Sequence, residues 1–497
     1  MTGLVAILRQ MLSLLVAAAV IVPVVAEAAP RRDRSLEKRL LEHIQVLAGD
    51  DYAGREPGTE GEAKTLQYLG KTWFDIGLVS GTNDPGNEWF MPVTLVAREP
   101  DSSTAQFTRN SREIEVPEKD LLILTSGKRS LVRNAPLFFV GKAEDDSFAR
   151  NELAGRVAVM LDAGIANSER QNALLSAGAL GVITVLDGER TLEQVAARRR
   201  RSGYALANDS LGGDLEGFIT RAGMDVLLKP TRYSMARLER YAQQERFVPR
   251  LLGVRASLEA TTRETTIKTF NALGKLPGKD PAKGAVLFVA HWDHFGTCAE
   301  APAEDLICNG AIDNASGLAA LTEVARRLAK DSRHDRDIYF LATTAEELGL
   351  LGAHAFAENP PIPLSRFVAA FNIDSVAVAP RDTPMAIIGK GMTGLDDEIA
   401  KIAQREGFRL SRSDAANRFV RRQDGWALLQ HDIPAVMVSS AYGEIGRMER
   451  YFDSHYHRPS DDLSLEIEVG GAAQDVQFLI ELGRWFADAA SYSPHSD

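Results

Sequence analysis

The sequence predicts an α/β fold with a mostly parallel central sheet and helices on both faces, and three observations support this. First, short apolar runs recur from about residue 260 onward, and each is nearly continuous, which is typical of parallel strands buried on both faces. Second, amphipathic segments separate the runs, such as 316–329, with apolar residues at helical spacing. Third, the runs are short enough to be strands. The strand candidates are 285–290, 338–342, 367–373 and 435–439.

The composition is that of an ordinary globular protein. Of 497 residues, 45% are hydrophobic and 25% charged, which excludes a disordered or collagen-like chain. A guide of about 150 residues per domain suggests roughly three domains. The 57 basic and 68 acidic side chains leave a net charge of −11, which argues against nucleic acid or an anionic membrane as the main partner. Two cysteines exclude a disulfide-rich scaffold.

The first 28 residues have the pattern of a secretory signal peptide. An apolar run over 11–25 follows Arg9, and Ala26-Glu27-Ala28 fits a cleavage site. An uncleaved anchor is the alternative, but the run is shorter than the roughly 20 residues of a membrane span. No other long apolar stretch occurs. We therefore predict a periplasmic or extracellular protein without a stable membrane anchor after cleavage.

The chain before the predicted sheet divides into three regions. Residues 35–80 have helical periodicity, interrupted by a Gly- and Pro-containing loop at 54–59. Residues 100–130 are polar and are expected to be irregular. Residues 130–250 have the sequence pattern of a separate module, in which short apolar strands alternate with helices. Its strand candidates are 136–140, 157–161 and 181–185.

Side chains that can bind metal follow three of the predicted strands. His291, Asp293 and His294 come after the first strand, and Glu346 and Glu347 come after the second. Asp374 directly follows the third. Each alone has a simpler explanation, such as a solvated surface pair or a structural histidine. Because ligands bind at the carboxyl ends of strands in such sheets, the convergence predicts one functional site at that edge.

Five segments carry a family resemblance: 290–294, 309–317, 345–349, 372–374 and 457–461. In these segments and in their order, the chain resembles the co-catalytic zinc exopeptidases of the bacterial leucyl aminopeptidase, aminopeptidase Y and glutamate carboxypeptidase type. The resemblance covers about 35–95 and 255–485. It implies a catalytic domain split into 35–110 and 255–490. The module at 130–250 resembles an inserted protease-associated domain.

The resemblance implies a ligand set for two zinc ions. His291 and Asp374 would hold one ion, Glu347 and His457 the other, and Asp313 would bridge both. Imidazole and carboxylate are ligands that zinc uses, and a catalytic site keeps a position open for water. Other divalent metals could occupy the same ligands.

The resemblance also assigns the remaining polar residues of the site. Glu346 would be the general base, and Asp293 would orient His291, as carboxylates commonly do for ligating histidines. His294 and His455 would be structural or lie behind the ligands.

The implied activity is hydrolysis of N-terminal residues from peptide substrates. A water shared by the zinc ions would attack the carbonyl, and Glu346 would transfer its proton to the leaving amine. A carboxypeptidase or dipeptidase on the same scaffold is the alternative, and a non-catalytic receptor is a further one. Ser375 and the segment 423–426 depart from the aminopeptidase pattern, so the substrate side chain stays open. Arg418, Arg421 and Arg422 are candidates for holding a substrate carboxylate.

Cys298 and Cys308 flank the loop between the first two ligand segments. An oxidising compartment permits a disulfide there, and we expect one. Two free buried thiols are the alternative.

Overall fold

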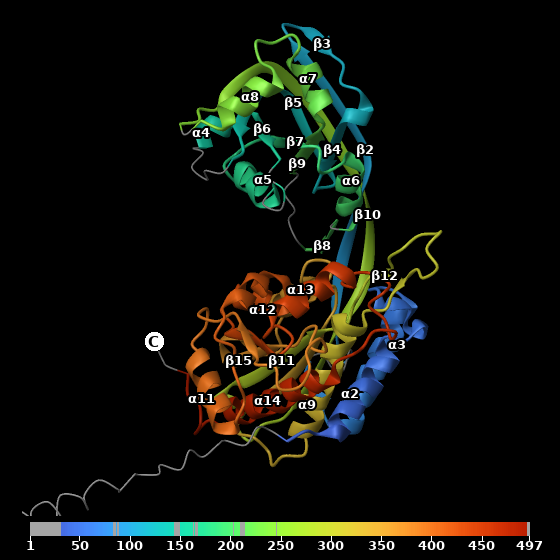
Figure 1. The fold of residues 1–497 in the computed structure, drawn as a ribbon, viewed down its shortest axis with the longest axis vertical. Helices are drawn as coiled ribbons and strands as arrows, with labels where there is room; N and C mark the ends of the chain where they lie inside the picture. Colours follow the sequence, from blue (N-terminus) through green and yellow to red (C-terminus); the bar gives the residue numbers. More distant parts are fainter. Residues whose placement is uncertain are drawn as a thin grey trace, which may run out of the picture.

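Two lobes joined by a pair of long strands make up the described chain (Figure 1). The computed structural model describes residues 31–494 apart from 83–85, 87–88, 144–149, 163, 165–166, 202, 209–213 and 245. The predicted signal peptide lies outside these residues. The connecting strands are β2 (Phe90–Arg109) and β10 (Arg250–Leu276). We call the chain between these two strands, with the ends of the strands that contact it, the small lobe, and the rest the large lobe.

The large lobe contains the predicted sheet. Its strand order is β16-β17-β15-β11-β14-β10, and the four strands from β17 to β14 are parallel to one another. The outer strands β16 and β10 run antiparallel to their neighbours. This confirms the mostly parallel α/β fold. The bounds are β11 (Ala285–His291), β14 (Asp337–Thr343), β15 (Phe367–Asn372), β16 (Ala386–Ile388) and β17 (Ala435–Ser439).

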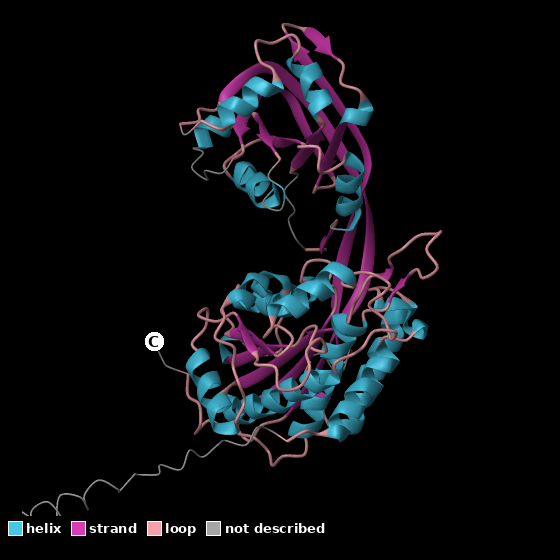
Figure 2. Ribbon diagram, in the orientation of Figure 1, coloured by secondary structure: helices cyan, strands magenta, loops and turns pink. Residues whose placement is uncertain are grey.

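Helices cover both faces of this sheet because its strands are apolar on both faces (Figure 2). In β11, Val286 and Phe288 pack into a core with the first group of helices, whereas Leu287 and Val289 pack toward the second. The first group is α2 (Arg34–Leu47), α3 (Glu60–Ile76), α9 (Gly317–Leu328), α11 (Asp396–Glu406) and α14 (Val469–Ala487). The second is α10 (Leu351–Glu358) and α12 (Asp424–Leu429). The large lobe also contains helix α13 (Ile445–Ser454) and the two-residue strand β1 (Val79–Ser80).

The strands of the small lobe continue the same sheet beyond β10, where β5 pairs with it, and they pack into a hydrophobic core of their own. Strands β5, β6, β7 and β9 are parallel, and β4 pairs antiparallel with β9. The predicted strands 136–140, 157–161 and 181–185 fall on β5, β6 and β7. The strand bounds are β3 (Arg112–Ile114), β4 (Leu121–Thr125), β5 (Arg129–Gly141), β6 (Val157–Leu161), β7 (Gly181–Val185), β8 (Tyr204–Leu206) and β9 (Leu215–Ile219). The helices are α4 (Arg150–Leu153), α5 (Asn167–Ser176), α6 (Leu192–Arg201), α7 (Arg221–Leu228) and α8 (Met235–Ala242).

The prediction of irregular structure over 100–130 is wrong. Strand β2 continues to Arg109, and β3 and β4 follow within this region. Here β2 pairs with β10 as an antiparallel ribbon, and residues 99–106 of β2 are all exposed. A strand with no buried face has no reason to alternate apolar and polar residues, so its sequence resembles a loop. Arg98 pairs with Glu264 across the ribbon at 2.7 Å.

No helix among the described residues is long and apolar enough to cross a membrane.

Candidate metal centre

Strand ends and two loops bring the predicted site residues together at one edge of the large lobe's sheet. His291 is the last residue of β11, and Asp374 lies two residues beyond β15. Glu346 and Glu347 follow β14. Asp313 lies in a π-helical turn, Ala311–Ser316, that leads into α9, and the His457 loop lies between α13 and α14.

Asp313 lies between two groups of side chains. On one side its Oδ1 is 3.2 Å from Nε2 of His291, and that nitrogen is 3.6 Å from Oδ1 of Asp374. On the other side Oδ2 is 3.4 Å from Nε2 of His457, which is 2.9 Å from Oε2 of Glu347. One carboxylate thus offers a separate oxygen to each group.

Polar atoms at this point are buried without hydrogen-bond partners. Among the described residues they are Nε2 of His291, His294 and His457 and Oδ2 of Asp313. Burying such atoms unpaired is costly, so their convergence calls for a ligand that all of them can contact. Two imidazoles and three carboxylates form a donor set that suits zinc, and the residues present therefore fit the implied metal ions.

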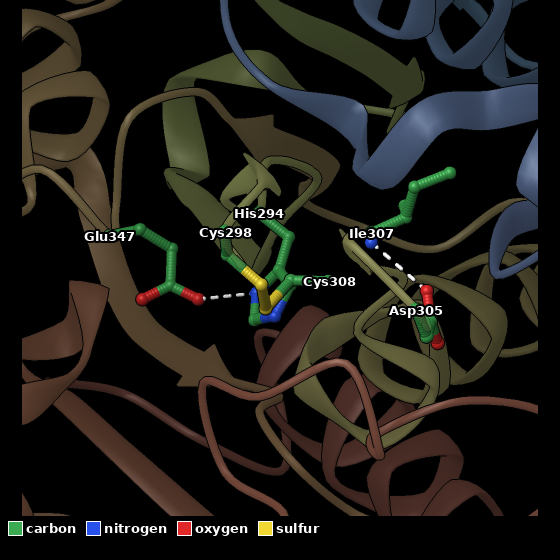
Figure 3. Close-up of a disulfide and its surroundings, with 6 residues drawn as sticks. All are labelled: His294, Cys298, Asp305, Ile307, Cys308 and Glu347. Atoms are coloured by element: carbon green, nitrogen blue, oxygen red, sulfur yellow. Dashed lines mark hydrogen bonds and ion pairs between the residues drawn. A yellow bond between two sulfur atoms is a disulfide. The ribbon is translucent and has the colours of Figure 1, made fainter. Parts of the chain in front are cut away.

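His294 lies closer to this site than the sequence suggested. Its Nδ1 is 2.6 Å from Oε1 of Glu347, as the close-up shows (Figure 3). The other oxygen of that carboxylate faces His457. His294, Asp313 and Glu347 also offer ligand atoms within 4.8 Å of one another, as do His291, Asp313 and Asp374. Two histidines therefore compete for the role of ligand beside Glu347.

Asp293 connects two strand ends. The carboxylate is fully buried and accepts hydrogen bonds from the backbone N–H groups of Glu346 at 3.1 Å and Glu347 at 3.3 Å. Toward His291, the backbone oxygen of Asp293 lies 3.1 Å from Nδ1, whereas its carboxylate oxygen is 3.8 Å away. Asp293 thus fixes the glutamate loop directly and the imidazole mainly through its main chain.

Burial and neighbouring charges shift the pKa values of Glu346 and His457. Burial raises the pKa of Glu346 well above its usual value, and the nearby carboxylates of Glu347 and Asp374 raise it further. Burial alone would lower the pKa of His457, but Glu347 and Asp313 raise it to about 9. The excess of carboxylates makes this edge a strong attractor of cations.

Asp461 has a supporting role that we did not predict, although it lies in one of the matching segments. It is fully buried and accepts hydrogen bonds from the backbone N–H groups of Ile312 at 2.9 Å and Asp313 at 3.0 Å. The Tyr451 hydroxyl donates a third at 2.8 Å. Asp461 therefore holds the turn that presents Asp313. Its only signal in the sequence is its place four residues after His457.

The expected disulfide is present. Cys298 and Cys308 are bonded, with their Cα atoms 5.7 Å apart, across the short hairpin of β12 (Gly296–Thr297) and β13 (Ile307–Cys308) (Figure 3). His294 lies two residues before the hairpin, so the bridge stiffens a segment that adjoins the site.

The three candidate arginines separate in space. Arg418 pairs with Glu449, and Arg421 lies 3.3 Å from Glu169 of the small lobe. The Arg422 guanidinium lies over the ring of Tyr456, 5.2 Å from its centroid. That ring stacks on the imidazole of His457 at 3.6 Å. Only Arg422 therefore borders the site.

The comparisons with known proteins agree with this geometry. Residues 271–479 match the model of peptidase family M28, a range that includes every proposed ligand. This segment is therefore a peptidase family M28 domain, and the protein is a metallopeptidase, a hydrolase of peptide bonds. The resemblance drawn from the five segments is confirmed at this level.

Solved structures are similar to this chain over most of its length, and the first of them shares the fold. An aminopeptidase from Aneurinibacillus sp. strain AM-1 is 18% identical, with a TM-score of 0.55, over 93% of this chain and 96% of that one. BSAP, a zinc aminopeptidase from Bacillus subtilis, is 16% identical, with a TM-score of 0.47, over 92% and 97%. A peptidase M28 precursor from Shewanella amazonensis is 16% identical, with a TM-score of 0.44, over 93% and 98%. No curated protein sequence matches the chain.

Proposed function

We propose that this metallopeptidase is a two-zinc aminopeptidase that removes N-terminal residues from peptides. The observation that carries the proposal is the position of Asp313 between two groups of donors whose buried nitrogens lack hydrogen-bond partners. His291 and Asp374 would hold one ion, and Glu347 and His457 the other. Zinc ions in such a pair lower the pKa of a bound water toward about 7 and polarise the scissile carbonyl.

Glu346 is the general base in this proposal. Its neighbour Glu347 faces His294 and His457, which leaves Glu346 as the glutamate free to accept the proton of the attacking water. A base with a raised pKa holds that proton firmly enough to carry it to the leaving amine. Asp293 supports this step because it fixes the backbone of both glutamates.

The surplus of carboxylates supports a substrate with a free α-ammonium group. Asp424 lies beside Thr343 at the end of β14, and its Oδ1 is buried with no hydrogen-bond partner in the described part of the chain. Burial raises the pKa of Asp424 to about 6, and a nearby cation would lower that pKa again. A positively charged N-terminus would therefore be stabilised at this end of the site.

A carboxypeptidase or dipeptidase is the second candidate, and Arg422 is the observation that favours it. Its guanidinium borders His457 through Tyr456 and could bind the C-terminal carboxylate of a short substrate.

A substrate panel separates these candidates. The purified protein would be assayed on aminoacyl-anilides and on N-blocked peptides, before and after chelation. We expect turnover of the free-amine substrates, loss with chelator and recovery with zinc. Cleavage of N-blocked peptides alone would replace the aminopeptidase with the carboxypeptidase. A metal-loaded protein that cleaves neither set would support the receptor-like alternative.

We also propose that the protein is secreted to the periplasm or medium and meets peptide substrates there. The signal-like pattern of residues 1–28 and the disulfide both support an oxidising compartment. N-terminal sequencing of the secreted protein should begin at Ala29. A mature chain that retains Met1 would contradict cleavage.

A further inference from the structure

Arg55 is a fully buried arginine whose guanidinium contacts the main chain of the metal-binding loops. Its residue exposure is 0%. Its Nε donates to the backbone oxygen of Trp292 at 2.9 Å, between His291 and Asp293. Its Nη1 donates to Asn309 O at 2.6 Å and its Nη2 to Gly310 O at 3.0 Å, just before the Asp313 turn. One side chain thus joins both loops.

The same guanidinium anchors these loops to the N-terminal helices. Nη1 also donates to the backbone oxygen of Leu47, the last residue of α2, at 2.8 Å. The backbone oxygen of Arg55 in turn accepts from the N–H of His294 at 3.3 Å. Arg55 therefore contacts the main chain on both sides of Asp293.

The backbone around Arg55 leaves little freedom for another arrangement. Gly54 has a φ of +66°, and a Cβ there would lie 2.4 Å from the backbone oxygen of Cys308. The segment is therefore wedged against the disulfide hairpin. Arg55 itself has a φ of +51°, in the left-handed region that few arginines adopt.

Arg55 is also a buried cation without an ion-pair partner among the described residues. Its hydrogen bonds go to neutral carbonyls, while the carboxylates of Asp461, Asp313 and Asp293 influence it from a distance. Burial lowers its pKa to about 10, so it stays charged at neutral pH. The positive charge of Arg55 offsets part of the repulsion among these carboxylates, which lie close together in the metal-free site.

We propose that Arg55 is a positioning residue for the metal centre: it clamps the two loops that present His291 and Asp313, so that the site binds zinc tightly. The inference rests on the proposed two-zinc site. Partners behind the ligands commonly change metal affinity about 10- to 100-fold when they are replaced.

Arg336 provides a matched control within the same chain. It is also buried, at 3% exposure, and donates to backbone oxygens: Nε to Lys283, Nη1 to Phe486 and Nη2 to Tyr492, each at 2.8 Å. It precedes β14, so it lies at the opposite end of the sheet from the metal-binding edge. Loss of either arginine removes the same kind of buried hydrogen bonds.

The test compares Arg55→Gln and Arg55→Lys with Arg336→Gln and Arg336→Lys. Zinc affinity is measured by competition with a chelator of known affinity, and the melting temperature of each metal-free protein is recorded. We expect all four variants to lower the melting temperature. Only the Arg55 variants should weaken zinc binding, by about 10- to 100-fold, with Arg55→Lys less affected because it keeps the charge. The lysine variant serves if the glutamine variant does not fold.

Two results would overturn the inference while leaving the proposed function intact. One is unchanged zinc affinity in Arg55→Lys and Arg55→Gln. The other is an equal loss of affinity in the Arg336 variants, which would indicate a general loss of stability. If the native chain binds no zinc at all, the proposed function fails as well, and the native protein in the same titration shows this directly.

Discussion

Asp293 explains how two adjacent glutamates can have different tasks. Its carboxylate accepts from both backbone N–H groups, so the main chain of Glu346 and Glu347 is fixed while their side chains diverge. The side chain of Glu347 contacts two histidines. Chemistry at this site therefore depends on which glutamate is changed.

Replacement of Glu346 should separate metal binding from turnover. We expect Glu346→Gln to lower kcat by about 100- to 10,000-fold, because a general base contributes that much, while zinc content stays native. Glu347→Gln is the matched control and should lose zinc. Steady-state kinetics and metal analysis measure both. Full activity in Glu346→Gln would refute its role as base.

The competition between His294 and His457 can be resolved by zinc stoichiometry. We expect His457→Ala to bind about one zinc ion, because a ligand is lost. His294→Ala should still bind two at saturation but with affinity about 10- to 100-fold lower, as for a residue that orients Glu347. Isothermal titration of the metal-free proteins measures both quantities. The reverse pattern would make His294 the ligand.

The sequence predicted the individual residues whose side chains were proposed as ligands or base. It missed Asp461 and Arg55, whose side chains form hydrogen bonds with the backbone of the loops that hold those ligands. The expected ligands do converge, because they follow strand ends or lie in motifs. Asp461 and Arg55 hold backbone N–H and carbonyl groups of distant loops. Such contacts arise only when the chain is folded, so neither spacing nor periodicity reveals them.

The elements were predictable where burial imposes a pattern. The strand candidates at 285–290 and 435–439 match β11 and β17 to within one residue. The outer part of β2 was missed because its exposed residues impose no pattern, whereas β10 was missed although every second side chain over 252–262 is buried. The prediction of helices over 35–80 is largely right, but the loop at 54–59 gave no hint that Arg55 is fully buried.

The disulfide hairpin should contribute measurably to stability. Cross-linking a loop of this length removes chain entropy worth about 2–3 kcal/mol from the unfolded state. The double replacement Cys298→Ser with Cys308→Ser should lower the free energy of unfolding by about that amount. Urea denaturation measures it, and the reduced native protein is the control. If reduction leaves the midpoint unchanged, the bridge contributes nothing to stability.

The contact between α2 and α9 should give the protein a pH-dependent stability. Glu323 of α9 is buried and lies 2.7 Å from Nε of Arg39 and 2.7 Å from Nε of Arg326. Burial opposes its ionisation, but His43, Arg39 and Arg326 lower its pKa from 4.5 to about 2. Stabilisation by this carboxylate is therefore complete above about pH 4.5 and disappears as the pH falls through about 2.

We expect Glu323→Gln to destabilise the protein by about 3 kcal/mol at pH 7, because it removes one partner of a buried ion-pair cluster. The difference from the native protein should shrink as the pH falls from 4.5 toward 2. Urea unfolding at a series of pH values measures it. A difference that is constant from pH 7 to pH 3 would contradict the assignment.

Metal removal should weaken the whole large lobe, because the proposed ligands come from the end of β11, from the loops after β14, β15 and α13, and from the turn before α9. A ligand that binds only the folded state stabilises it by about 2.7 kcal/mol at a free concentration of 100 times Kd. Chelation should therefore lower the melting temperature, and added zinc should restore it. The Asp313→Asn variant is the control and should respond weakly to both. An identical melting curve with and without chelator would argue against a resident metal.

The ribbon of β2 and β10 also makes the small lobe a part of the molecule that can be replaced. Phe90 pairs with Ala272 at its base and Thr108 with Arg255 near its top, so both ends of the small lobe leave the large lobe side by side. Topologically the small lobe occupies the place of a turn in an oversized hairpin. A two-residue turn between paired positions such as Ala97 and Thr265 would close the same gap, and a different module could be grafted onto the same two stems without rerouting the chain around the metal centre.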